Sequence, residues 1–115
     1  MARQTLTAAV TVGPWPTVGV AITETAADAS NKEQTLCTGR EIIVGRNSGA
    51  STRSVTITSK ADSKTGRTGD ITTTIATGAT KMFGPFDPDG FRQASDGMIY
   101  FEAAHAEILW HVIRF

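Results

Sequence analysis

Histidine and glutamate side chains near the end of the chain are the first candidates for chemistry. His105 and His111 are the only two histidines, and Glu102 and Glu107 lie close to them in the sequence. Two histidines and one carboxylate can bind a metal ion, but a site forms only where such ligands converge on one point. The simpler interpretation places His105 in a turn and His111 on the outward side of a strand. We therefore expect no metal site and no catalytic residue.

Aspartate and glycine residues elsewhere form patterns that are typical of turns. Asp87, Asp89 and Asp96 suggest a calcium loop, but the spacing of an EF-hand loop, with its sixth-position glycine and twelfth-position glutamate, is absent. The run Gly66–Gly69 lacks the strand-to-helix context and the lysine of a phosphate-binding loop. The sequence also has no Gly-x-Ser-x-Gly nucleophile motif. We expect a non-enzymatic protein that needs no cofactor.

A short basic segment contains Lys60, Lys64 and Arg67, with Asp62 and Asp70 interspersed. Such a segment is usually a solvated loop. It could instead make a salt-sensitive contact with an acidic protein surface, so these three cations are candidate partner contacts.

The two tryptophans have different surroundings. Trp15 stands between Pro14 and Pro16, which donate no backbone hydrogen bond and hold the chain extended. Its ring is either tucked against the edge of the fold or presented to a partner, because tryptophan supplies a large apolar contact area. Trp110 lies inside the last apolar run, which favours a place in the core.

Composition narrows the range of partners and compartments. Eleven Lys and Arg residues balance eleven Asp and Glu residues, which argues against nucleic acid or an anionic membrane as a partner. No apolar run is long enough to span a bilayer, and the first residues do not resemble a signal peptide. We expect synthesis in the cytoplasm, with the single Cys37 as a small apolar filler beside Leu36.

Threonine content and short alternating segments predict an all-β fold. The 115 residues include eighteen threonines, many of which alternate with valine or isoleucine, as is typical of half-buried strands. We expect a single domain over residues 1–115, an antiparallel β-sandwich or compact barrel of the jelly-roll kind with an extended N-terminal arm. The polar, alanine-rich segment Glu24–Gln34 could form a short helix, but a loop is favoured. About eight short strands are expected, at residues 4–12, 17–23, 41–47, 53–59, 70–76, 81–86, 98–103 and 107–115.

The segment from Glu41 to Phe86 has the pattern of an antiparallel meander. A strand ends near Asn47, a turn follows, and a return strand begins at Arg53, with two further strands behind them. The last two apolar runs, 98–103 and 107–115, are more continuous than the others. Both should be central strands buried on both sides, or one of them meets a partner chain.

Several short motifs of this region together resemble a family. A strand that runs into Gly45-Arg-Asn-Ser-Gly-Ala-Ser, the return Ser54-Val-Thr-Ile-Thr, and then Gly84-Pro-Phe, Ser95-Asp-Gly and Ile99-Tyr-Phe occur in this order. In this the chain resembles small all-β structural proteins of tailed-bacteriophage virions, over roughly residues 41–101. The resemblance carries over no catalytic residue. It implies a capsid decoration or cement protein that binds and stabilises the lattice of the major capsid protein, or else a head–tail or tail component.

The expected partners follow from this resemblance. The arm from Met1 to Pro16, or the Trp15 turn within it, should contact major capsid protein on the outer surface of the virion, after synthesis in the host cytoplasm. Copies of the chain should also associate with one another, with a homotrimer as the natural arrangement at three-fold positions. Nucleic acid, membranes and small-molecule substrates are not expected.

Two other classes of function remain open from the residues alone. The chain could be a small carbohydrate-binding module that stacks sugars on Trp15 and on Trp110 or Tyr100. It could also be a small enzyme that uses His105 or His111. The first requires exposed aromatic rings, and the second requires the histidines to share a concave site with a carboxylate.

Overall fold

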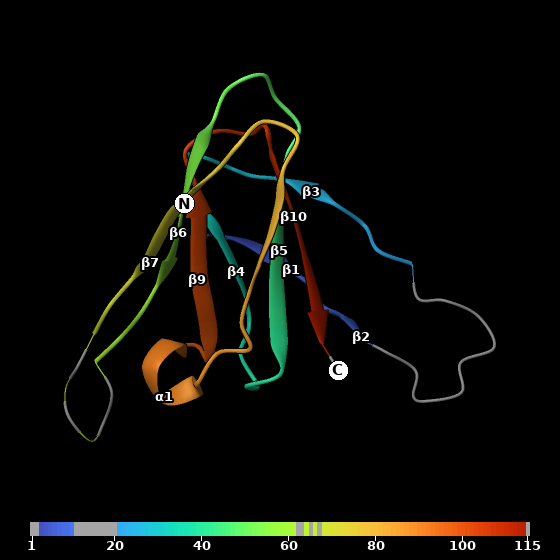
Figure 1. Cartoon of the computed structure of the whole chain (residues 1–115). Coiled ribbons are helices and arrows are strands. Elements are labelled where there is room, and N and C mark those ends of the chain that lie inside the picture. Colours follow the sequence, from blue (N-terminus) through green and yellow to red (C-terminus); the bar gives the residue numbers. More distant parts are fainter. Residues whose placement is uncertain (1–2, 11–20, 62–63, 65, 67, 115) are drawn as a thin grey trace.

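The computed structural model of this protein describes residues 3–10, 21–61, 64, 66 and 68–114, and these residues form two packed β-sheets (Figure 1). The first sheet has five strands in the order β1-β4-β9-β6-β7. Its only parallel pair joins β1 to β4. The strands are β1 (Gln4–Leu6), β4 (Glu33–Leu36), β9 (Met98–Ala103), β6 (Arg53–Thr58) and β7 (Ile71–Ile75).

The second sheet is built around β10. Its main path runs β2-β10-β5-β8, and β3 also pairs with β10. The members are β2 (Ala9–Val10), β10 (Ile108–Arg114), β5 (Glu41–Asn47), β8 (Thr80–Phe83) and β3 (Thr25–Ala26). The all-β sandwich expected from the sequence is confirmed, with ten strands in the described residues because several are only two or three residues long.

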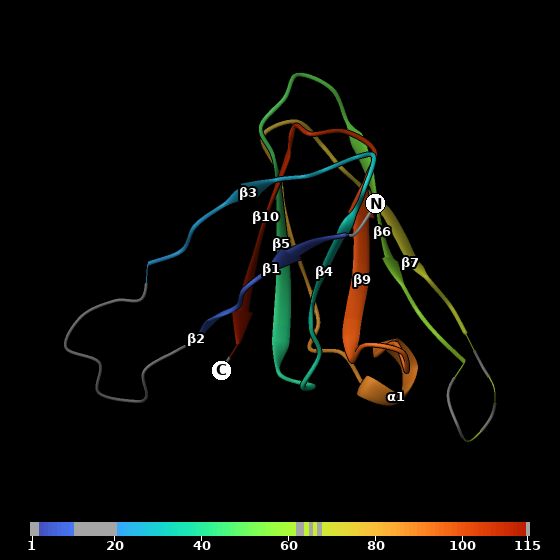
Figure 2. The ribbon, with the colours of Figure 1, turned by 180° about the vertical axis from the view of Figure 1, so that it is seen from behind.

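Of the first expected strand, residues 4–12, the described residues 4–10 are divided between the two sheets, and 11–12 lie outside the described residues. β1 pairs in parallel with β4 of the first sheet, whereas β2 pairs in parallel with β10 of the second. The change of sheet follows Leu6, whose side chain is buried and whose carbonyl oxygen accepts a hydrogen bond from the Thr35 hydroxyl at 2.8 Å. Residues 3–10 therefore form an N-terminal strap that passes from one sheet to the other (Figure 2).

The expected meander over residues 41–86 is wrong, because β5 and β6 lie in different sheets. Asn47 explains the change of sheet. Its side chain is fully buried, and its amide nitrogen donates to the carbonyl oxygens of Ser51 and Ile75 at 2.7 and 2.8 Å, while its Oδ1 accepts from the Gly49 N–H at 2.9 Å. These bonds shape a corner between the sheets, so that only β6 and β7 remain a hairpin.

β9 and β10 are likewise consecutive strands of different sheets. Both are central strands, as expected. Burial along each alternates between buried and half-buried residues, so neither is enclosed equally on both faces. The turn between them is a second corner between the sheets.

A contact between aromatic rings joins the two central strands. Phe101 of β9 and Trp110 of β10 meet edge to face, with ring centroids 4.9 Å apart. Trp110 is 0% exposed, as the sequence predicted, and Cys37 is buried among the apolar core residues. The core also contains Ile43, Val55, Ile57, Ile75, Ile99, Ile108 and Val112.

Two local expectations need correction. The segment Glu24–Gln34 forms no helix, but it is not simply a loop, since it contains β3 and the first two residues of β4. The turn expected after Phe86 is a single helical turn, α1 (Pro88–Phe91), which begins where Asp87 accepts the Asp89 N–H at 3.0 Å. Of the expected strand 17–23, residues 17–20 lie outside the described residues, and 21–23 are not in a strand.

Replacing Gly45 by alanine should destabilise the fold by about 1–3 kcal/mol, because the added methyl group would overpack the core. A Cβ atom there would lie 2.9 Å from Trp110 Cζ3 and 3.1 Å from Ile75 Cδ1. Urea unfolding followed by circular dichroism measures the change. Gly69→Ala is the control, because a Cβ atom at that position meets nothing within 4 Å, and its effect should stay within about 0.5 kcal/mol. Equal stability of the two variants would contradict this packing.

Candidate interaction surface

The two histidines occupy separate places, and His105 lies beside a carboxylate, with its Nδ1 3.5 Å from Glu107 Oε1. His105 is exposed in the corner before β10, where its Nδ1 accepts the Glu107 N–H at 3.1 Å. His111 lies in the middle of β10, on the outer face of the second sheet and opposite Val44. Arg53 pairs with Glu107 at 2.6 Å. These positions agree with the expected turn and outward strand residues, and the described residues contain no group of three side chains that could hold a metal ion.

The aspartates of the calcium-like pattern serve local structure. Asp87 caps α1, and Asp89 lies 3.9 Å from the Lys60 ammonium. Asp96 accepts the Met98 N–H at 3.0 Å and the Tyr100 hydroxyl at 2.6 Å. This agrees with the turns predicted for these positions.

Of the six residues predicted as partner contacts, the structure describes two, Lys60 and Lys64. Pro14, Trp15, Pro16 and Arg67 lie outside the described residues. Lys60 contacts α1 in two ways. Its backbone N–H donates to the Gly90 carbonyl oxygen at 2.7 Å, and its ammonium group pairs with Asp89. Lys64 is exposed.

The outer face of the first sheet is polar along β6 and β7, whereas Leu36 and Met98 lie on it at β4 and β9. Hydroxyl side chains alternate outward along β6 and β7, and Ser54 and Thr56 lie opposite Thr74 and Thr72. Beside them, the Arg3 guanidinium stacks 4.1 Å above the centre of the Tyr100 ring. This face is typical of a solvated sheet surface.

The outer face of the second sheet carries several apolar side chains, with Arg46, Thr80 and His111 among them. Val44 of β5 is only 8% exposed although it does not belong to the core cluster. Its neighbours across the sheet are Met82 of β8, which is 72% exposed, and His111 of β10. The next residue pair on this face is Ile42 with Ile113. We call the set Ile42, Val44, Met82, Leu109 and Ile113 the apolar face.

The sequence indicated the β10 residues of this face but not those of β5 and β8. The continuous apolar run in β10 favoured either burial on both sides or contact with a partner chain, and Leu109 and Ile113 belong to that run. Met82 could not be assigned, because its place beside Val44 depends on the pairing of β8 with β5. That pairing contradicts the meander predicted from the order of the strands.

The apolar face ends at an open edge strand, β8, which carries Lys81. Lys81 lies opposite Gly45, and its ammonium group reaches Thr73 Oγ1 of β7 at 3.2 Å, from the second sheet to the first. A charge on an edge strand that points inward opposes pairing with the edge of another molecule.

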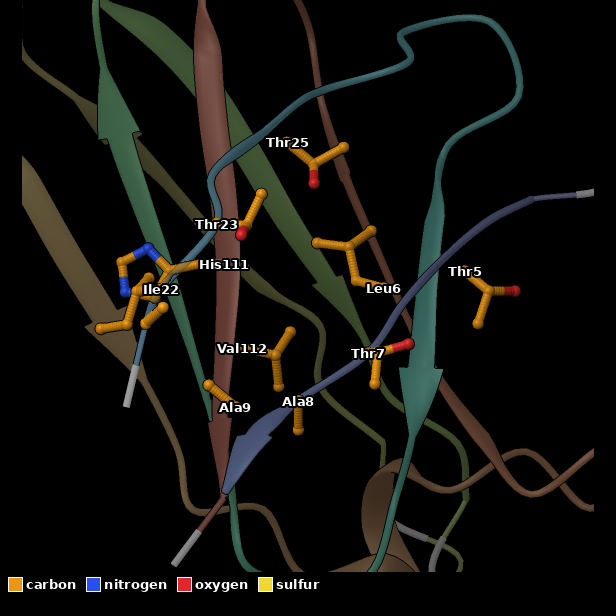
Figure 3. A pocket seen from close by; sticks show the side chains of 11 residues that line it. Thr5, Leu6, Thr7, Ala8, Ala9, Ile22, Thr23, Thr25, His111 and Val112 are labelled. Atoms are coloured by element: carbon orange, nitrogen blue, oxygen red, sulfur yellow. The ribbon is translucent and has the colours of Figure 1, made fainter. Parts of the chain in front are cut away.

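A cavity of about 350 Å³ opens between the N-terminal strap and residues 21–25 (Figure 3). It lies over the stretch of β10 between its β3 and β2 partners, at His111 and Val112. Burial lowers the pKa of His111 below its usual value, and the Glu24 charge opposes this shift. The imidazole is therefore neutral at neutral pH, and its Nδ1 has no hydrogen-bond partner within the described structure. Hydroxyl groups in the lining come from Thr5, Thr7, Thr23 and Thr25.

Comparison with known proteins yields no match to a family model, to a curated protein or to a solved structure. No helix in the described part of the chain is long and apolar enough to cross a membrane. The structure itself bears on the sugar-stacking hypothesis, which needs exposed aromatic rings. Trp110 is enclosed in the core and offers no stacking surface, and Arg3 occupies one face of the Tyr100 ring.

Replacing Lys81 by valine should promote self-association, because the edge of β8 loses its inward charge. We expect association at a roughly tenfold lower protein concentration, equivalent to about 1.4 kcal/mol. Analytical ultracentrifugation over a concentration series measures it. Lys64→Val, which removes an exposed lysine far from this edge in sequence, is the control. If both variants sediment like the unmodified protein, Lys81 does not protect the edge.

Proposed function

We propose that this chain is a non-enzymatic structural protein of a tailed-bacteriophage virion, a capsid decoration or cement protein that binds and stabilises the major capsid protein lattice. The family resemblance supports this proposal. Its motifs lie at structurally important places: the Asn47 corner, strand β6, the segment after β8, and the turn before β9. The observation that carries the proposal furthest is the apolar face of the second sheet.

The character of this face favours a protein partner. Five apolar side chains lie on it, of which Met82 is 72% exposed and Val44 is buried. Arg46, on the same face, is neutralised by Glu24 through two hydrogen bonds of 2.9 Å. An exposed apolar surface with a charge-neutral border is typical of protein–protein contact. Phosphate groups would instead require clustered, unpaired cations. We assign the major capsid protein to this face.

The N-terminal arm would extend the same contact. Segment 11–20, which contains Trp15, lies outside the described residues, but the strands on either side of it both pair with β10. That strand also carries Leu109 and Ile113 of the apolar face. The pairing of both flanking strands with β10 supports a contact between the Trp15 segment and the same capsid partner.

Binding of many copies to one capsid would raise the overall affinity. Each copy would add a modest affinity, and association between copies, as a homotrimer around a three-fold position, would make their contacts cooperative through effective concentration. Such a role needs a rigid core and outward contacts. It does not need a catalytic pocket.

Replacing Met82 by aspartate should weaken binding to the lattice by about 2 kcal/mol, a roughly thirtyfold loss, because a charge would be buried at the contact. Co-sedimentation with expanded empty capsids of the phage that encodes the chain measures the affinity. Stability should change little, since Met82 is largely exposed.

The matched control for Met82→Asp is Leu36→Asp. Leu36 is also an exposed apolar residue, 49% exposed, but it lies on the outer face of the first sheet. The Leu36→Asp variant should bind capsids as tightly as the unmodified protein does. An equal loss of capsid affinity in both variants would show that the apolar face is not the contact. Failure of the unmodified protein to bind capsids would overturn the proposed function.

Trp15→Ala tests the arm. If Trp15 anchors the chain to capsid protein, its removal should cost roughly 2 kcal/mol of binding or more, with an unchanged melting temperature. The same co-sedimentation assay and a thermal melt are sufficient. Unchanged binding with a lower melting temperature would instead make Trp15 part of the domain's own packing.

A further inference from the structure

Glu33 is an acidic side chain enclosed in the apolar interior. It is the first residue of β4, it is 0% exposed, and its side chain points inward beside the core. One carboxyl oxygen, Oε2, accepts the Asp28 N–H at 2.7 Å. The other, Oε1, has no hydrogen-bond partner in the described structure, and neither has the nearby Trp110 indole nitrogen.

Other buried polar side chains nearby are better satisfied. Glu41 is also enclosed, but both its oxygens accept from Thr38, at 2.6 Å from the N–H and 2.7 Å from the hydroxyl. Asn47 forms three hydrogen bonds. A buried carboxylate with a single hydrogen bond is costly in its charged form, whereas the protonated form is neutral and can also donate.

The electrostatic surroundings favour the protonated form. Burial raises the pKa of Glu33 to about 7, and the negative charge of Asp28 acts in the same direction. The Asp28 N–H and the Arg3 charge oppose the shift, and so does the Trp110 indole N–H, which lies near the carboxyl group without reaching hydrogen-bond geometry. Lys32, the residue before Glu33, pairs with Glu102 at 3.6 Å.

Two parts of the fold are attached at this residue. The Asp28 N–H bond holds the crossover from β3 to β4, which passes from the second sheet to the first. The Glu33 carbonyl oxygen accepts from Arg3 at 3.1 Å, and the adjacent Lys32 carbonyl oxygen accepts from the Gln4 N–H at 2.9 Å. The crossover and the start of the strap therefore both depend on the position of β4.

We propose that Glu33 is a proton-dependent latch: with its proton it holds the strap and the β3–β4 crossover closed, and on losing the proton to solvent it loosens both. The hairpin of β6 and β7 lies on the far side of β9 from this site and keeps its structure. The inference does not depend on the proposed virion function.

The pH range of the effect follows from proton linkage. The pKa of Glu33 is 4.5 in the unfolded chain and about 7 in the folded one. Its protonation therefore contributes fully to the stability of the fold below pH 4.5, and this contribution is lost as the pH rises through about 7. Over this range one proton changes the ratio of closed to open molecules by at most tenfold per pH unit, or on the order of a hundredfold in total. At higher pH the ratio stays at its lower level.

Amide hydrogen exchange on the whole chain, expressed as protection factors at pH 5 and pH 8, tests the latch. We expect protection of the amides in β1 and β4 to fall at least tenfold at pH 8, and protection in β6 to change much less. In Glu33→Gln, which keeps the size of the side chain and cannot ionise, the difference between pH 5 and pH 8 should vanish. The proposal is overturned by an equal fall in every strand, by no fall, or by the same fall in the variant.

A second measurement does not require the variant to fold. Carbon-13 NMR of the Glu33 carboxyl group in the unmodified protein reports its titration directly. A midpoint near 7 supports the latch, and a midpoint near 4.5, the ordinary value, contradicts it.

Discussion

The contact between Phe101 and Trp110 is the interaction on which the rest of this structure depends. The two rings come from the central strands of different sheets and meet edge to face with their centroids 4.9 Å apart, so they set the position of one sheet over the other. Gly45 on β5 leaves the space that the Trp110 ring fills. Because β9 and β10 are consecutive, the chain must change sheets between them, and the corners at Asn47 and at the N-terminal strap accompany this arrangement.

The sequence predicted the parts of this fold that depend on local pattern. Alternation of threonine with valine and isoleucine located most of the longer strands, and the apolar character of residues 107–115 placed Trp110 in the core. Pairing could not be predicted in the same way, because a period of two tells which residues share a face but not which strand lies beside them. The meander failed for this reason. An Asn-Ser-Gly sequence suits a hairpin turn, but the buried Asn47 amide binds Ile75 of another strand, which no local pattern reveals.

The candidate surface shows the same division. Basic and aromatic residues stand out in a sequence, and they supplied the predicted contacts Lys60, Lys64, Arg67 and Trp15. The apolar face requires the registers of β8, β5 and β10 together, since only these bring Met82 beside Val44. The two outer faces differ in emphasis: hydroxyl groups line β6 and β7 on one, and apolar side chains predominate along β5, β8 and β10 on the other, where Arg46 is paired with Glu24. That difference supports the proposed assembly role, in which one face would lie in solvent and the other against a protein lattice.

Electron cryomicroscopy of the virion in which this chain is proposed to be a component tests the central claim most directly. A reconstruction at a resolution that separates the two sheets should place copies of the domain on the outer capsid surface, with Met82 and Val44 against the major capsid protein and the hydroxyl-lined sheet toward solvent. Density for the domain only in the neck or tail would contradict a capsid role. A domain on the capsid with its apolar face turned to solvent would contradict the assignment of that face.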